Sequence, residues 1–154
     1  AAASAGLALL AEGSTLELAD ADGLTFSPDS DRSIRRTQLL HELTDITLTS
    51  AESLAAGLFA AGEERRPSSS VLAVLGQLTD VDLATLIEAT PRSGSAYALL
   101  LDVGTFAGSR QGSAQAHYAM ELANRGWQVS LATASTSVPN AWAALREASG
   151  VLAT

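Results

Sequence analysis

The chain contains no cysteine and no lysine, and each absence excludes a class of chemistry. Without cysteine there are no disulfides, no thiolate nucleophile and no zinc–sulfur centre. Without lysine there is no Walker A lysine on a phosphate, no Schiff-base lysine and no serine–lysine dyad. All nine Lys-or-Arg positions are therefore arginine.

Charge is also sparse, and its balance is acidic. Charged residues make up 17% of the chain, and the net charge is −8 with a pI of about 4.5. Nucleic acids and anionic lipid surfaces both require clustered basic residues, so we expect neither as the main partner. No apolar run reaches the ~18 residues of a membrane span, so we expect no direct membrane insertion of this segment.

The first residues do not have the pattern of a signal peptide. The stretch AAASAGLALLAEG lacks a basic n-region and carries Glu12. The chain starts with alanine rather than methionine, which indicates a processed or excised piece of a longer chain. Its 154 residues, 47% of them hydrophobic, fit a single domain over residues 1–154 with a core of its own.

Three apolar segments in the second half are the strongest structural signal. Ser70–Gln77, Ala96–Val103 and Trp127–Ala134 are rich in valine and leucine, and a helical pattern follows each of them. Strands this apolar are typical of a parallel sheet that helices cover on both faces. We therefore predict an α/β fold, a three-layer sandwich with a mostly parallel sheet, and any site at the loops that leave the strand carboxyl ends. Trp127 and Trp142 are expected in the core.

The first half predicts a hairpin and further helices. Thr15–Ala19 alternates like a strand, and Asp22-Gly23 is a strong turn signal before an antiparallel edge strand at Leu24–Ser27. Ser137 is expected to cap the last helix. We expect helices over Ala1–Ala11, Arg32–Leu43, Ala51–Ala61, Val81–Ala89, Ser113–Asn124 and Asn140–Ala148.

Several runs resemble a known family. The second half contains VLAVLGQLTDVDLATL, ALLLDVGTFAG and LANRGWQVSLATASTSVPNAWAAL, and the first half has an Ala-rich helix, GSTLELADADG and RRTQLLHEL in matching order. These runs resemble the C-terminal part of the actinobacterial "domain of unknown function 58" proteins, whose core is similar to a von Willebrand factor A domain. The resemblance covers essentially the whole chain. It implies a membrane-attached parent protein, with this segment in a cytoplasmic part that docks other proteins.

The resemblance also bears on metal binding. A von Willebrand A-like sheet has a central first strand that ends in an Asp-x-Ser-x-Ser metal motif, and this chain has no such motif. The nearest string, at residues 29–31, has the wrong pattern. The family's threonine loop would fall near Thr49–Ser53 and its later aspartate near Asp80, where Thr79-Asp80 matches. A divalent ion needs several oxygen ligands in fixed geometry, so we predict no metal site and no cofactor.

The absent strand has a consequence for assembly. In the family's order it would lie between Thr15–Ala19 and Ser70–Gln77. Its loss leaves unpaired backbone in the middle of a sheet, which is unfavourable unless another strand fills the gap. We therefore expect either that the two strand groups close up or that another chain supplies a strand, so that self-association is one form of the expected protein partnership.

Two enzyme classes are the alternatives to a binding role. A serine hydrolase lacks its Gly-x-Ser-x-Gly elbow, since Ser109 lies one position early, and surface helix positions explain His41 and His117. The loop Gly104–Gly112 leaves a strand and opens a helix, so its N–H groups and Arg110 could hold an anion. The Gly-x-Gly-x-x-Gly fingerprint is missing, and a crossover loop explains the same glycines.

The aspartates divide into two groups. The four between residues 20 and 31 lack the rest of a calcium loop, and turn and cap roles explain them. Asp80 and Asp102 lie at strand carboxyl ends, where α/β sites assemble. Asp80 is expected to cap a helix. Asp102 ends a buried strand and needs a partner, for which Thr105 and Arg110 are the candidates.

The predicted function is that of a non-enzymatic protein-interaction module, a degenerate von Willebrand A-like domain without its metal site. The alternative is a small α/β hydrolase or phosphate-handling enzyme that uses the strand carboxyl-terminal loops. An enzyme would bring its polar residues together in one pocket beside a histidine, whereas diverging loops would favour the binding role. No catalytic residue is assigned, and the candidate binding residues are Thr79, Asp80, Asp102, Thr105, Ser109 and Arg110.

Overall fold

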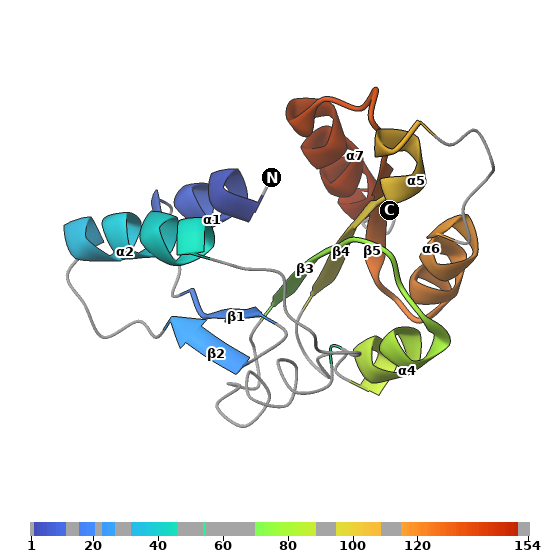
Figure 1. Cartoon of the computed structure of the whole chain (residues 1–154). Helices are drawn as coiled ribbons and strands as arrows, with labels where there is room; N and C mark the ends of the chain where they lie inside the picture. Colours follow the sequence, from blue (N-terminus) through green and yellow to red (C-terminus); the bar gives the residue numbers. More distant parts are fainter. Residues whose placement is uncertain are drawn as a thin grey trace. The chain divides into compact units, whose positions relative to one another are not determined.

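The structure, a computed structural model of the chain, describes residues 2–11, 16–20, 23–26, 32–45, 54, 70–88, 95–108 and 115–150 (Figure 1). The chain divides into two compact units, Ala1–Arg65 and Arg66–Thr154. The prediction of one α/β domain stays a prediction. Among the described residues, no helix combines the length and the apolar character that crossing a bilayer requires.

The described residues of the first unit form two helices and a hairpin. Helix α1 (Ala2–Ala11) packs against α2 (Arg32–Asp45), and both lie where the sequence predicts them. Gly6 permits their close approach, because a Cβ built there would lie 2.6 Å from Leu39 Cδ2. Leu39 is fully buried, so it has little room to move away.

The hairpin corrects one prediction about the sheet. Strand β1 (Leu18–Asp20) pairs antiparallel with β2 (Gly23–Phe26), with Asp20 opposite Gly23. The expected hairpin therefore forms, although Gly23 lies in the strand rather than in the turn. The prediction of an antiparallel edge strand on the main sheet is wrong: the two strands form a separate two-stranded sheet, and the main sheet is parallel throughout. These short strands are close together in the sequence and pair with each other, which requires no pairing with distant segments.

The second unit contains the parallel sheet. Strands β3 (Val71–Leu75), β4 (Ala96–Leu101) and β5 (Gln128–Ala132) lie in the order β3-β4-β5. Leu75 is opposite Leu100, and Leu101 is opposite Ala132. Each strand falls within a segment predicted from its apolar run, which confirms the α/β class and the parallel pairing.

Helices cover this sheet on both faces. The described helices of the unit are α4 (Asp80–Glu88), α5 (Val103–Phe106), α6 (Gln115–Asn124) and α7 (Val138–Gly150). Helix α7 packs on Leu99 and Ala132 through Ala141 and Leu145, with Leu101 and the half-buried Trp142 against this cluster. Helices α4 and α6 lie on the other side of the strands (Figure 1). This arrangement is compatible with a three-layer sandwich. The short α5 lies in the predicted loop, and the helix expected over residues 51–61 lies outside the described residues apart from Leu54.

A glycine at the end of α6 directs the chain into β5. Gly126 has a φ of 88°, a left-handed conformation that favours glycine. Its N–H donates to Ala123 O at 3.0 Å, and the Trp127 N–H donates to Leu122 O at 3.1 Å, which is the Schellman pattern. Trp127 and Leu122 are both buried, so the predicted core position of Trp127 is confirmed.

Candidate functional site

The loops after the three parallel strands lie at one edge of the sheet, which we call the carboxyl edge and define as residues 76–82, 102–108 and 133–140. Ligands of α/β folds bind at this edge, because successive loops converge there. Four predicted site residues belong to it: Thr79, Asp80, Asp102 and Thr105. Ser109 and Arg110 lie outside the described residues.

The turn between β3 and α4 is closed by a reciprocal cap. The Thr79 N–H and hydroxyl donate to Asp82 Oδ2 at 3.0 and 2.7 Å, and the Asp82 N–H donates to Thr79 Oγ1 at 3.3 Å. Thr79 is therefore the N-cap, with an acidic partner three residues later. The prediction that Asp80 caps this helix is wrong, because Asp80 is its first helical residue.

Asp80 instead accepts a hydrogen bond from another helix. The Tyr118 hydroxyl of α6 donates to Asp80 Oδ1 at 3.1 Å. Burial raises the pKa of Tyr118 above its usual value of 10.0, and the hydrogen bond to Asp80 and the charges of Asp80 and Asp82 raise it further. This contact joins α4 to α6 beside the carboxyl edge.

The end of β4 is hydrogen-bonded to β5 and, through Thr105, to the turn after β5. The Asp102 N–H donates to Ala132 O of β5 at 2.8 Å. The Thr105 hydroxyl donates to Asp102 O at 2.7 Å and accepts from the Ala134 N–H at 2.9 Å. Thr105 thus fixes the start of α5 against the turn after β5.

The Asp102 side chain, in contrast to its backbone, makes no hydrogen bond among the described residues. It is 7% exposed, it makes no cap bond at the start of α5, and its Oδ1 atom has no hydrogen-bond partner in the described part of the chain. Of the two predicted partners, Thr105 bonds the main-chain oxygen rather than the carboxylate, so that assignment is wrong. A buried carboxylate without a partner is costly, which makes Asp102 the most unusual residue of this edge.

Gln115, like Asp102, is buried and has a side-chain oxygen without a described partner, and it is not among the site residues predicted from the sequence. This first residue of α6 is 3% exposed, and its Nε2 donates to Gly76 O at 2.9 Å, at the end of β3. Its Oε1 has no hydrogen-bond partner among the described residues. A glutamine after a Gly-rich loop gives no signal of burial, because glutamine is usually exposed at such positions. Tyr118 was also missed, because its hydroxyl bonds a residue 38 positions away, which local sequence does not indicate.

Hydroxyl groups hold the turn after β5. Thr133 Oγ1 lies 2.9 Å from Ser135 Oγ and 3.0 Å from Thr136 Oγ1, and the Thr133 N–H donates to Thr136 Oγ1 at 3.0 Å. The Asn140 N–H donates to Ser137 Oγ at 3.3 Å, which supports the predicted cap at Ser137. These hydroxyls contact the main chain and one another, which are structural roles.

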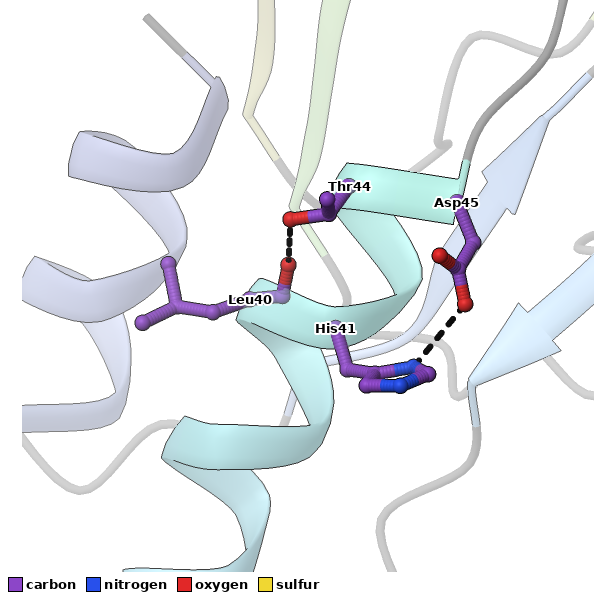
Figure 2. Close-up of polar contacts among 4 residues, drawn as sticks. All are labelled: Leu40, His41, Thr44 and Asp45. Atoms are coloured by element: carbon purple, nitrogen blue, oxygen red, sulfur yellow. Dashed lines mark hydrogen bonds and ion pairs between the residues drawn. The ribbon is translucent and has the colours of Figure 1, made fainter.

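None of the contacts described for the two histidines is to a predicted site residue. His41 Nδ1 lies 3.0 Å from Asp45 Oδ2 on the exposed surface of α2, where Thr44 bonds Leu40 O (Figure 2). His117 is exposed, and its ring centroid lies 5.7 Å from that of Tyr118. The contacts that the structure describes for these histidines thus include no serine or threonine nucleophile.

The carboxyl edge also exposes large apolar side chains. Val81 is 62% exposed and Phe106 58% exposed, and Val103 and Val138 are exposed as well. Each lies at the start of a helix that follows a strand, except Phe106 at the end of the short α5. We call these four residues the apolar rim. The three edge segments contain acidic side chains and no basic ones.

No combination of side chains in the described residues suggests a metal centre. No group of three or more histidine, aspartate or glutamate residues there could hold a metal ion. Comparison with protein families, curated proteins and solved structures finds no significant match to this chain. The geometry of the carboxyl edge is therefore the basis for a functional proposal.

Proposed function

We propose that this chain is a non-enzymatic protein-interaction module that docks its partner at the carboxyl edge. The apolar rim is the observation that carries this proposal. Large apolar side chains exposed in all three loops at one edge of a sheet are unfavourable in water, and a partner that covered them would remove this cost. We further propose that the module is a degenerate von Willebrand A-like domain without its metal site, a relationship supported by the sequence resemblance.

Charge indicates the kind of partner. Asp80, Asp82 and Asp102 belong to the edge, no basic side chain occurs in its three segments, and the chain carries a net charge of −8. A complementary partner would present apolar side chains beside a basic residue. The occupant that we propose is such a segment of a different protein.

The enzyme alternative receives no support from the described contacts. Hydroxyls at the edge bond the main chain, a capping carboxylate or one another, and no described contact of a histidine is to one of them. A serine hydrolase needs its hydroxyl nucleophile within hydrogen-bond reach of a histidine, and phosphate binding needs donors rather than buried acceptors.

The test is selection of a random peptide library displayed on phage against the wild-type chain. We expect enriched peptides that combine apolar residues with lysine or arginine. Their binding should fall by about tenfold or more in Phe106→Ser, because one large apolar contact at an interface contributes on that scale. Met120→Ser is the matched control, since Met120 is 61% exposed but lies within α6 rather than in an edge segment.

Three results would overturn the proposal. The library could yield no enrichment over an unrelated acidic protein of similar size. The selected peptides could bind Phe106→Ser as tightly as wild type, which would place their site elsewhere. They could also lose as much affinity in Met120→Ser as in Phe106→Ser, which would show that the effect is not specific to the apolar rim.

A further inference from the structure

We propose that Asp102 and Gln115 form a receptor for one basic side chain of the docked partner, a lysine ammonium or an arginine guanidinium. This inference rests on the proposed docking function, and it names the group that the site recognises. Two buried acceptor atoms that have no hydrogen-bond partner among the described residues carry the argument.

Both acceptors are more than nine-tenths buried. Asp102 is 7% exposed and Gln115 3% exposed, and Asp102 Oδ1 and Gln115 Oε1 have no hydrogen-bond partner among the described residues. The orientation of the glutamine amide is determined by its neighbour, because Gly76 O can only accept a bond. The Nε2 group must therefore face Gly76, and the Oε1 atom is the one left without a donor.

Topology brings the two side chains to the same side of the same edge. Leu101 packs with the cluster that α7 covers, and successive side chains along a strand point to opposite faces. The Asp102 N–H continues the bonding to β5, and from this alternation we infer that its side chain points to the face covered by α4 and α6. Gln115 begins α6 and is bonded to the end of β3, the strand next to β4.

An organic cation fits these acceptors better than the other ligand classes. An anion would be repelled by the Asp102 carboxylate, and two oxygen acceptors lack the donors that an anion requires. A metal ion needs more oxygen ligands than this pair supplies, and the described residues contain no group of three metal-binding side chains. Ammonium and guanidinium groups carry only donors, and their charge compensates the buried carboxylate.

The described edge segments do not supply this cation. The whole chain has no lysine, and the edge segments contain no arginine. Val103 and Phe106 follow Asp102 closely in the chain and are exposed. They can pack against the aliphatic stem of a lysine or arginine whose charged end reaches the carboxylate.

The test is a titration of the wild-type chain with n-butylammonium chloride, followed by two-dimensional NMR of backbone and side-chain amides. Tetramethylammonium chloride at equal ionic strength is the control, because it has the same charge but no N–H donor. We expect saturable shifts of the Gln115 side-chain amide and of the Asp102 and Val103 backbone amides with n-butylammonium. Tetramethylammonium should leave these signals unchanged.

Two variants localise the effect. Asp102→Asn removes the charge, and Gln115→Met removes the amide acceptor at similar length. Each should weaken n-butylammonium binding by about tenfold or more, as expected for loss of a charge-assisted hydrogen bond. The comparison of the two cations on the wild-type chain needs no variant, so it decides the matter even where a variant does not fold.

The outcomes separate this inference from the docking proposal. Equal shifts with both cations, or no shifts at Gln115 and Asp102, would overturn the receptor while leaving the rim-dependent peptide binding intact. Shifts at the same signals with magnesium chloride at lower concentration would overturn it in favour of a metal. Specific n-butylammonium binding without any enriched peptide would uphold the amine site and overturn the docking function.

Discussion

Asp82 and Asp102 are equally buried carboxylates in opposite hydrogen-bonding situations, and this contrast makes a sharp prediction. Asp82 is 6% exposed, and its Oδ2 accepts two hydrogen bonds from Thr79. Asp102 is 7% exposed, and its Oδ1 has no partner among the described residues. Replacement of each by asparagine removes the charge and changes the shape very little. The two substitutions should therefore shift the free energy of unfolding in opposite directions.

The magnitudes follow from the contacts. Asp82→Asn replaces charge-assisted bonds by weaker neutral ones, and we expect a loss of about 1–2 kcal/mol, by analogy with hydrogen bonds to charged groups. Asp102→Asn relieves a buried charge that no described donor compensates. An unsatisfied buried group costs roughly 1–3 kcal/mol, and the amide retains part of that cost, so we expect a gain of about 1 kcal/mol.

Equilibrium unfolding in urea measures both changes. Trp127 is buried and Trp142 half-buried in the same unit, so their fluorescence reports its unfolding. The midpoints of the two variants should move to opposite sides of the wild-type midpoint at an unchanged slope. A loss of stability in Asp102→Asn as large as that in Asp82→Asn would refute the reasoning, because it would show that the Asp102 carboxylate is already satisfied.

Three further predictions concern packing, ionisation and assembly. Gly6→Ala should lower the free energy of unfolding, measured in urea, by about 1–3 kcal/mol, because the new Cβ would overlap the fully buried Leu39. Gly76→Ala is the control: nothing lies within 4 Å of its new Cβ, so the change should be less than about 0.5 kcal/mol. Equal effects of the two substitutions would contradict the packing of α1 on α2. Tyrosinate absorbance of a Tyr97→Phe variant, in which Tyr118 is the remaining tyrosine, should titrate above pH 10. Because the pKa of Tyr118 is higher in the folded than in the unfolded state, this hydroxyl contributes stability to the fold below its unfolded pKa, and the contribution is lost as the pH rises through its folded pKa. A titration of Tyr118 at or below pH 10 would contradict the burial of its hydroxyl. In the described sheet, β3 pairs with β4 on one side only, so its other side could pair with a second copy of the chain. Light scattering should then give twice the 15.8 kDa mass of the chain. The mass of a monomer would contradict this self-association.

The local pattern of apolar residues was sufficient to predict the strands of the parallel sheet. The apolar runs predicted β3, β4 and β5, because a strand covered on both faces must be apolar throughout. The Asp-Gly signal predicted the hairpin, since turn chemistry acts within a few residues. Which strands share a sheet is a matter of long-range pairing, and there the expected antiparallel edge strand was wrong.

For the candidate site, too, the sequence predicted which residues lie at the edge of the sheet but not which contacts they make. The sequence by itself determined that Thr79, Asp80, Asp102 and Thr105 follow buried strands and so reach one edge of a parallel sheet. Tertiary structure alone decided their roles: Thr79 rather than Asp80 caps α4, and Thr105 bonds a main-chain oxygen. It also placed Gln115 against Gly76, residues 39 positions apart in the chain. Hydrogen-bond partners and burial depend on packing between distant segments, which local composition does not encode.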